Sequence, residues 1–520
     1  MLKKFVYSLL SLLYLIANLE AQTNQSYKVP VYNDADRLAH IQKMLPLIDS
    51  LYKNYAKARN FPSLSYGVLL DGKIVYSGHV GSIQLDKNIP SDIHSMYRIA
   101  SMSKSITAMA IMQLRDAGAL HLDDPASKYL PYLKQDKLLT TDAPAITIRH
   151  LLTHGAGFPE DNPWGDRQLE DKNSDLVDLI QQGTYFSNVP GITFEYSNTG
   201  FALLGQIVEK VSGKTLEAYT KEKIFLPLGM THTEWEYTKV PADKLAHGYR
   251  STGGQWAEEP LLHHGSYGAM GGLITSIEDF SKYVAFHQSA WPPRSGPEHS
   301  VLRRSTLREM QMPGNFSGLN PNFKYASGRP CAVVSTYFCG LGWMMDCEGR
   351  VYIGHSGGLP GFGSQWRMLP EYGLGVISFA NLTYAGLGGI NLQVLDTLIR
   401  RAGLKPFAIP PSDILLQRKK EILDIIPDWT DTKVAKYGHG TTNIFAENFF
   451  PDYGLEQLRT SHRSMFDDIG QIKSIDEVVP ENQLRGTFKI HGEQGSLLVF
   501  YTLSPENPPL IQELRLSKEE

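Results

Sequence analysis

Strand-like runs at two distant places in the chain constrain its fold most strongly. Residues 64–70 and 73–77 flank Asp71-Gly72, a pair that allows both central residues of a tight hairpin turn to take positive φ. We predict an α/β (α+β) domain in which an antiparallel sheet is flanked by helices and completed by strands far along the chain, with the mostly helical residues 105–310 inserted between them. A cleft between the sheet and the helical part is where we expect the chemistry. The later strand runs are 341–346, 350–353, 363–369 and 374–380, and a helix is predicted for 391–401.

The length of 520 residues exceeds one ordinary core, so a second and smaller domain is expected. Prolines cluster in residues 404–412 and oppose both a helix and a central strand, which predicts a linker at 404–415. The linker separates a large domain at 30–403 from a small α+β domain at 416–520. The small domain has a helical run at 455–466 and strand runs at 483–490, 495–503 and 511–516.

The beginning of the chain has the pattern of a secretory signal. Lys3 and Lys4 precede an apolar run at 5–17, and we predict a cleaved signal peptide at 1–21. The run is short for a transmembrane helix and no comparable segment follows, so the protein is expected to be exported, either periplasmic or secreted. Next, apolar residues at helical spacing predict an amphipathic helix over 37–57, which Pro46 could kink or divide.

The three cysteines, Cys331, Cys339 and Cys347, lie close together in the sequence. In an oxidising compartment one pair could form a disulfide, but they could equally be simple core residues. Their spacing does not match a zinc framework, which needs paired ligands at closer intervals.

Charge and histidine spacing argue against several classes of function. The net charge is -4 with no long run of either sign, so neither nucleic acid nor an anionic surface is an expected partner. His150 and His154 have the i, i+4 spacing of helical zinc ligands, but the glutamate of H-E-x-x-H is absent. We therefore expect no metal and no other cofactor.

The first chemical motif is Ser101-x-x-Lys104, which stands just before the apolar run 106–117. That run predicts a helix buried on nearly every face, with Ser101 in its first turn and Lys104 on the same side. Burial disfavours the charged form of lysine, so the pair could supply an activated nucleophile. The plain alternative is a serine that caps the helix beside a solvated lysine.

The second motif is Tyr196-x-Asn198, directly before the apolar helix predicted for 201–211. A position between a loop and a helix can present a phenol to a cleft. The ordinary tyrosine pKa of about 10 is too high for a base, and we expect the Lys104 ammonium to lower it. A structural tyrosine bonded to the backbone is the alternative.

The third motif is His355-x-Gly357 followed by Gly358, which we place between two strand runs. Glycine there would let a substrate backbone approach closely, and an edge strand can direct an NH group at an oxyanion. A histidine in a turn is the alternative, because this chain has several histidines near a glycine.

With these motifs in order, the chain resembles the class C beta-lactamases and the penicillin-binding-protein-like serine hydrolases. The resemblance covers residues 40–400 and includes the nucleophile segment Tyr97–Lys104 and the segments 120–133, 146–157 and 268–280. It implies a beta-lactamase/transpeptidase-like fold. His355 stands where many relatives have lysine, a pattern similar to family VIII esterases and D-aminopeptidases, and its loss of a permanent cation makes strong beta-lactamase activity unexpected.

The resemblance also implies a role for each site residue. Ser101 would attack a carbonyl, with Lys104 and Tyr196 sharing the role of general base. The NH groups of Ser101 and Gly358 would hold the oxyanion beside Gly357, and Asn198 would orient Lys104 or a substrate amide. If His355 lines the cleft, its protonation is expected to tune anion binding near neutral pH.

We therefore predict a serine hydrolase that cleaves a small-molecule ester or a peptide-like amide. A DD-carboxypeptidase acting on cell-wall peptides is the nearer alternative, and a non-catalytic ligand-binding relative is the more distant one. The loop 158–167 could rim the cleft, with Trp164 stacking on substrate. The C-terminal domain resembles cystatin-like appendages of such hydrolases and could mediate self-association.

Overall fold

The computed structural model describes residues 27–133, 139–438 and 443–519. The predicted signal peptide at 1–21 lies outside these residues. The chain forms two compact units, Asp34–Pro406 and a smaller one made of Phe407–Glu520 together with residues 27–33. None of the helices in the described part of the chain is both long and apolar enough to cross a membrane.

A nine-stranded antiparallel sheet forms the centre of the larger unit, in the order β3-β2-β1-β13-β12-β11-β10-β9-β8. Asp71 and Gly72 take positive φ in the turn between β1 and β2, as expected. β1 pairs with β13 from Leu64 opposite Ala380 onward, which confirms that strands from the two ends of the domain complete one sheet. The strands are β1 Ser63–Leu70, β2 Lys73–Gln84, β3 Ile89–Pro90, β8 Asn315–Asn320, β9 Val333–Phe338, β10 Leu341–Asp346, β11 Val351–Leu359, β12 Phe362–Leu369 and β13 Leu374–Ala380.

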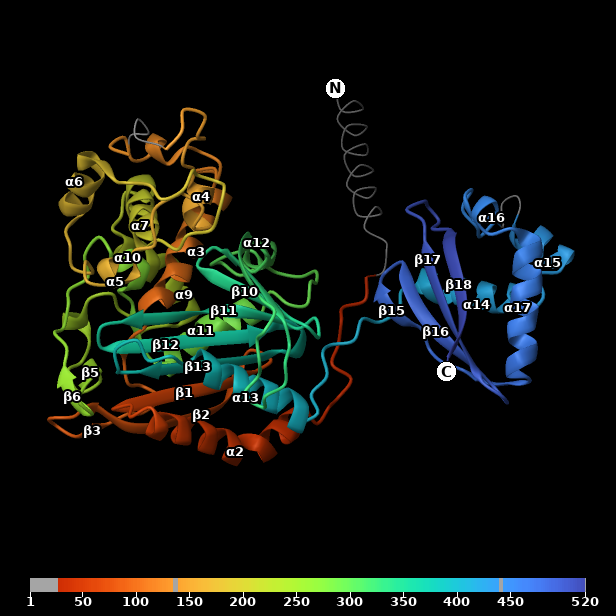
Figure 1. Ribbon diagram of the computed structural model, residues 1–520, viewed down its shortest axis with the longest axis horizontal. Coiled ribbons are helices and arrows are strands. Elements are labelled where there is room, and N and C mark those ends of the chain that lie inside the picture. Colours follow the sequence, from red (N-terminus) through yellow and green to blue (C-terminus); the bar gives the residue numbers. More distant parts are fainter. Residues whose placement is uncertain (1–26, 134–138, 439–442, 520) are drawn as a thin grey trace, which may run out of the picture. The chain divides into compact units, whose positions relative to one another are not determined.

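Helices cover both faces of this sheet (Figure 1). On one face, α2 (Arg37–Ala58) packs on β1 and β2, and α13 (Gly388–Arg401) packs on β12 and β13. On the other face, α11 (Ile277–Gln288) crosses β1, β12 and β13. α2 runs through Pro46 as one helix, so the predicted helix is present and is not divided there.

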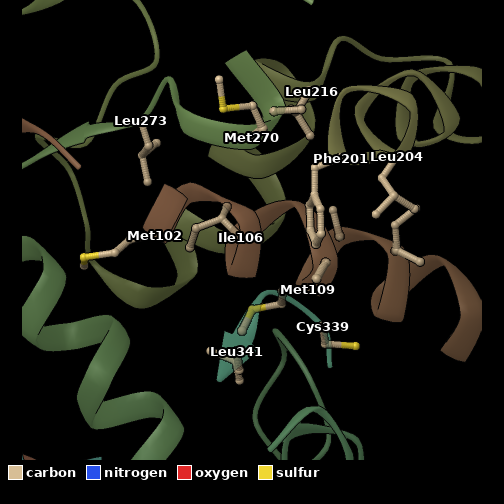
Figure 2. Close-up of a cluster of buried hydrophobic side chains, with 14 of the residues drawn as sticks. Met102, Ile106, Met109, Phe201, Leu204, Leu216, Met270, Leu273, Cys339 and Leu341 are labelled. Carbon is tan, nitrogen blue, oxygen red and sulfur yellow. The ribbon is translucent and has the colours of Figure 1, made fainter. Parts of the chain in front are cut away.

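The helix that follows Ser101 is α3 (Ser103–Asp116), and it lies in the middle of the helical part. Met102, Ile106 and Met109 are fully buried and meet side chains from several neighbouring elements, as Figure 2 shows. Burial on nearly every face agrees with the apolar sequence of this helix. The other elements of the larger unit are the 3₁₀ turn η1 Ala100–Met102, η2 Ala126–Lys128, α4 Ile148–Leu152, α5 Asn162–Gly165, α6 Asn173–Gly183, α7 Asn198–Ser212, α8 Leu216–Thr220, the π-helical η3 Lys221–Phe225, α9 Leu226–Leu228, η4 Tyr237–Lys239, α10 Gly268–Gly271, α12 Arg304–Met310 and η5 Pro370–Tyr372, with the strand pairs β4 Tyr97–Arg98 and β7 Ile274–Thr275, and β5 Tyr249–Thr252 and β6 Gln255–Glu258.

The smaller unit has its own apolar core, centred on the fully buried Trp429 and on strands that alternate buried and partly buried residues. Residues 404–412 hold only an isolated bridge between Val31 and Ala408. The elements of this unit are α14 Asp413–Ile425, α15 Asp431–Tyr437, α16 Phe449–Asp452, α17 Leu455–Ile469, β14 Ile472–Ile475, β15 Val479–Asn482, β16 Arg485–Gly492, β17 Ser496–Leu503 and β18 Ile511–Glu519.

Two sequence expectations are revised or decided by the structure. His355 to Gly358 lie within β11, which extends to Leu359, and not between two strands as expected. The two glycines do not end the strand because they continue the pairing with β12. Cys331 and Cys347 form a disulfide, whereas Cys339 is a free and buried thiol.

The turn between β9 and β10 presses against the start of α3. Gly340 has φ of 71°, and a Cβ there would lie 2.4 Å from the backbone nitrogen of Ser105. Gly349, in the turn between β10 and β11, also has positive φ, but a Cβ there would meet nothing within 4 Å. The two glycines therefore share a backbone constraint and differ in their surroundings.

We expect Gly340→Ala to lower the melting temperature clearly more than the matched control Gly349→Ala. Both variants incur about 1–2 kcal/mol for an L-residue in the left-handed region. Only Gly340→Ala adds a backbone collision, which costs about 1–3 kcal/mol more. Thermal unfolding of the three proteins measures the difference, and equal shifts would show that the turn does not support α3 as described.

Candidate active site

Ser101 lies in the 3₁₀ turn η1, which directly precedes α3. The sequence predicted instead that Ser101 would lie in the first turn of the regular helix. Its neighbour Ala100 takes φ of 50°, an unfavourable conformation for a residue with a Cβ. The turn is held from both sides, because the Ser103 hydroxyl donates to the Ala100 carbonyl at 2.7 Å and the Ser364 hydroxyl donates to the Ile99 carbonyl at 2.6 Å. Ser101 is thus fixed in one position at the end of a buried helix.

Lys104 is completely buried and points at Ser101. Its Nζ lies 3.0 Å from the Ser101 hydroxyl oxygen, 2.7 Å from Asn198 Oδ1 and 3.0 Å from the Met270 carbonyl oxygen. A neutral amine fits these contacts, since two N–H groups can donate to Asn198 and Met270 while the lone pair accepts the Ser101 proton.

Burial is the main reason that the pKa of Lys104 falls from its ordinary value to about 7. The carboxylates of Asp166 and Asp161 oppose this fall through their charges. Among the described residues, no carboxylate forms an ion pair with Lys104 at contact distance, and Asp166 and Asp161 act on it only through their charges. A large fraction of Lys104 is therefore neutral near pH 7, which a general base requires.

Tyr196 lies in the wall of the same site, with its hydroxyl hydrogen-bonded to Ser101. Lys104 Nζ is 4.9 Å from the centre of the Tyr196 ring. The expectation that Lys104 lowers the pKa of Tyr196 is wrong, because burial raises that pKa well above its ordinary value. Tyr196 therefore remains a neutral phenol that can pass a proton but does not act as a standing base.

The residues around Tyr196 are positioned by the N-terminus of α7. Ser197 caps the helix by accepting a hydrogen bond from the Gly200 NH group at 3.2 Å. Asp161 accepts from the NH groups of Asn198 and Thr199 at 2.6 and 2.9 Å, so its carboxylate satisfies the start of the helix. Asn198 is fully buried, and in this structure its side chain orients Lys104.

His355 joins the site from the sheet, with its ring centre 6.2 Å from that of Tyr196. Burial and the charge of Lys104 lower the pKa of His355 to about 3. The expectation that His355 titrates near neutral pH is therefore wrong. A neutral imidazole lies beside Tyr196 throughout the physiological range.

The edge of β11 borders the cleft beside Ser101. β11 pairs with β12 from Ile353 to Leu359, but with β10 only from Val351 to Gly354. Its β10-side edge is therefore not paired within the sheet from His355 onward, and it can receive a substrate strand or oxyanion. Gly358 lines the cleft, whereas Gly357 lets the strand pass the backbone near Ser101, since a Cβ there would lie 2.3 Å from the Ile99 carbonyl.

A cleft of about 450 Å³ contains Ser101, Tyr196, His355 and Gly358 in its walls. Asp166 also lines it, and burial raises the pKa of this carboxyl to about 6. Its Oδ2 accepts a hydrogen bond from the Tyr384 hydroxyl at 3.0 Å. Neither Asp166 nor Tyr384 was identified from the sequence. The only signal was the loop 158–167, where Trp164 could either stack on substrate or pin a surface loop. Asp166 of this loop lines the cleft, whereas Trp164 packs edge-on against Tyr267 and is 46% exposed.

The two histidines at zinc-like spacing do not face one another as a ligand pair. His150 bonds to Thr147 as part of the cap of α4. His154 packs among aromatic rings and accepts a hydrogen bond from the Ser197 NH group at 3.1 Å. Both therefore take part in local structure, and His154 also supports the Tyr196 segment.

Similar proteins include Protein flp from Staphylococcus aureus strain COL, which is 27% identical over 341 residues. That alignment covers 64% of this chain and 62% of the relative. Beta-lactamase-like protein 2 from Dictyostelium discoideum is 31% identical over 280 residues, and that alignment covers 52% of this chain and 50% of the relative. The chain therefore spans less than two thirds of the length of these relatives.

Two solved structures share the fold. The octameric penicillin-binding protein homologue from Pyrococcus abyssi has a TM-score of 0.59 and 22% identity, with 92% of this chain and 98% of that chain covered. The penicillin binding protein from Bacillus halodurans has a TM-score of 0.52 and 24% identity, with 66% of this chain and 98% of that chain covered. The Beta-lactamase family model matches residues 48–397. With this match over most of its length and the fold described above, the chain belongs to the beta-lactamase family of serine-hydrolase-like proteins.

Proposed function

We propose that this protein is an exported serine hydrolase that forms an acyl-enzyme at Ser101. The observation that supports it best is the completely buried Lys104, whose Nζ lies 3.0 Å from the Ser101 hydroxyl oxygen and can accept its proton when the amine is neutral. Burial of a lysine costs free energy of desolvation, and a protein that only binds ligands would have no reason to place a buried lysine beside a serine.

In the first step, Lys104 takes the proton of Ser101 as the hydroxyl oxygen attacks the carbonyl carbon. The NH groups of Ser101 and Gly358 are proposed to hold the negative charge that develops on the carbonyl oxygen. Fixed donors are effective there because the turn and the strand are already held in place. Tyr196 then gives its phenol proton to the leaving group and takes up the proton that Lys104 received from Ser101, so that Tyr196 is again a neutral phenol and Lys104 a neutral amine.

In the second step, a water molecule attacks the acyl-enzyme. Lys104 and Tyr196 act in reverse, removing a proton from the water and returning one to Ser101. The same groups serve both halves of the reaction, so their mutual placement within one hydrogen-bonded set is the main requirement.

We propose an ester or a peptide-like amide as the substrate. His355 is neutral where many relatives carry a lysine, which weakens the case for strong beta-lactamase activity. The similarity in fold to two penicillin-binding proteins supports a carboxypeptidase acting on cell-wall peptides as the second candidate.

Export and self-association are also proposals. The Cys331–Cys347 disulfide supports a periplasmic or secreted location, because such bonds persist in oxidising compartments. The penicillin-binding protein homologue from Pyrococcus abyssi is octameric, which supports self-association of this protein through its C-terminal unit as a proposal.

A fluorophosphonate should add its mass to the wild-type protein and not to Ser101→Ala, as read by intact-mass spectrometry. Ser335→Ala is the matched control, because Ser335 lines the same cleft without a lysine beside it. It should be labelled like the wild type. Labelling of Ser101→Ala, or loss of labelling in Ser335→Ala, would contradict the assignment of the nucleophile.

The rate of p-nitrophenyl acetate hydrolysis should rise with pH through one apparent ionisation near the Lys104 pKa of about 7. Because Lys104 and Asp166 interact, this ionisation belongs to the pair. Asp166→Asn removes a negative charge that raises the Lys104 pKa, so the midpoint should move to lower pH. His355→Asn should leave the midpoint in place, since the pKa of His355 is about 3.

Rate profiles of the three proteins from pH 5 to 9 make this comparison. A midpoint that moves upward in Asp166→Asn, or one that disappears in His355→Asn, would show that a different group controls the reaction.

A further inference from the structure

One cation in the cleft has no role in the proposed reaction. Arg367 lies on β12 and lines the same cleft as Ser101. No described carboxylate lies within ion-pair distance of its guanidinium, and its Cζ lies 5.8 Å from the centre of the Tyr352 ring. Burial lowers the pKa of Arg367, and the groups that oppose this are the phenols of Tyr352 and Tyr325. A half-buried cation without a countercharge is costly, which points to an anion from outside the protein.

Asp346, whose carboxylate contacts both Tyr325 and Tyr352, already accepts four hydrogen bonds. Asp346 Oδ1 accepts from the NH groups of Glu348 and Arg350 at 2.9 and 3.0 Å. Its Oδ2 accepts from the hydroxyls of Tyr325 and Tyr352 at 2.5 and 3.4 Å. Asp346 therefore serves the turn between β10 and β11 and does not neutralise Arg367.

A row of residues across the sheet connects Arg367 with the reacting groups. Tyr337 pairs with Gly342, Gly342 with Gly354, and Gly354 with Arg367. All four line the cleft, and the two middle positions carry no side chain. Gly342 leaves room along this row, whereas at Gly354 the backbones of β11 and β12 lie close together, since a Cβ there would lie 2.2 Å from the Trp366 carbonyl oxygen. We call this row the trough, with Arg367 at one end and Tyr337 at the other.

The Tyr337 end of the trough lies next to Tyr196 and His355 in the active site. The ring centre of Tyr337 lies 6.1 Å from that of Tyr196 and 5.5 Å from that of His355. Neighbouring strands lie about 4.8 Å apart, so three strand intervals place Arg367 roughly 14 Å from Tyr337. A substrate held at Ser101 could therefore extend along the trough and reach the guanidinium with its far end.

We infer that Arg367 binds a carboxylate at the far end of an extended substrate whose scissile carbonyl lies at Ser101. A planar guanidinium fork matches the two oxygens of a carboxylate. A single cation suits one negative charge, and Asp166 in the same cleft opposes a more highly charged group such as a phosphate dianion. This inference rests on the proposed function, since the same cleft must hold the acyl donor.

Binding in the Ser101→Ala protein tests the inference without turnover. The probes are the mono-p-nitroanilides of suberic and dodecanedioic acid and the methyl esters of their free carboxyl groups, measured by calorimetry at pH 7. For at least one chain length, the free acid should bind about tenfold or more tightly than its methyl ester, as for a hydrogen bond to a charged group. Hydrolysis of the matching p-nitrophenyl esters by the wild type is read separately and reports on the proposed function alone.

Adding Arg367→Gln should bring the ratio of the two dissociation constants to about one. Arg367→Met, which keeps the apolar stem against Tyr352, should do the same and serves if the glutamine variant does not fold. Arg401→Gln is the matched control, because it removes the same charge from an exposed position at the end of α13, and it should keep the preference. Equal binding of acid and methyl ester at both lengths, no binding of either acid, or a preference that survives the loss of Arg367 would overturn the inference.

Discussion

The burial of Lys104 beside Ser101 is the constraint on which the rest of the site depends. Removal of the Lys104 amine from water favours its neutral form, and the amine lies within hydrogen-bond distance of two carbonyl acceptors and the Ser101 hydroxyl group. The surrounding elements can be understood as support for that arrangement. α3 positions Lys104 within the core, Asn198 is held by the capped start of α7, and Met270 contributes its carbonyl from α10.

The sheet supplies the opposite wall of the cleft. Because strands from the two ends of the domain pair, β11 lies beside the turn that carries Ser101, although more than half of the domain separates them in sequence. Close approach requires a residue without a side chain at Gly357, and the Ser364 hydroxyl holds the Ile99 carbonyl on the same side. The incomplete pairing of β10 with β11 leaves the strand edge open at the place where the proposed chemistry needs donors.

Local patterns in the sequence were sufficient to predict six of the nine strands of the sheet, the buried helix and the three motifs, but not β3, β8 or β9. Asp71-Gly72 specifies a hairpin by backbone preference alone, and the apolar run after Ser101 specifies a buried helix by its composition. The pKa values of the site residues could not be predicted from such local patterns. The pKa values of Tyr196 and His355 depend on burial by residues distant in sequence. Burial favours the neutral form of both groups, so it raises the pKa of Tyr196 and, together with the charge of Lys104, lowers the pKa of His355. Asp166 and Tyr384 were missed since nothing local marks a carboxyl and a phenol that meet only in the fold.

The protonation state of Lys104 can be measured directly by an NMR titration of its labelled side-chain amine in the full chain, with Lys104→Arg used to assign the signal. The structure predicts an apparent pKa near 7, far below the ordinary lysine value. A Lys104 that stays fully protonated up to about pH 10, the ordinary lysine range, would contradict a neutral amine as the base.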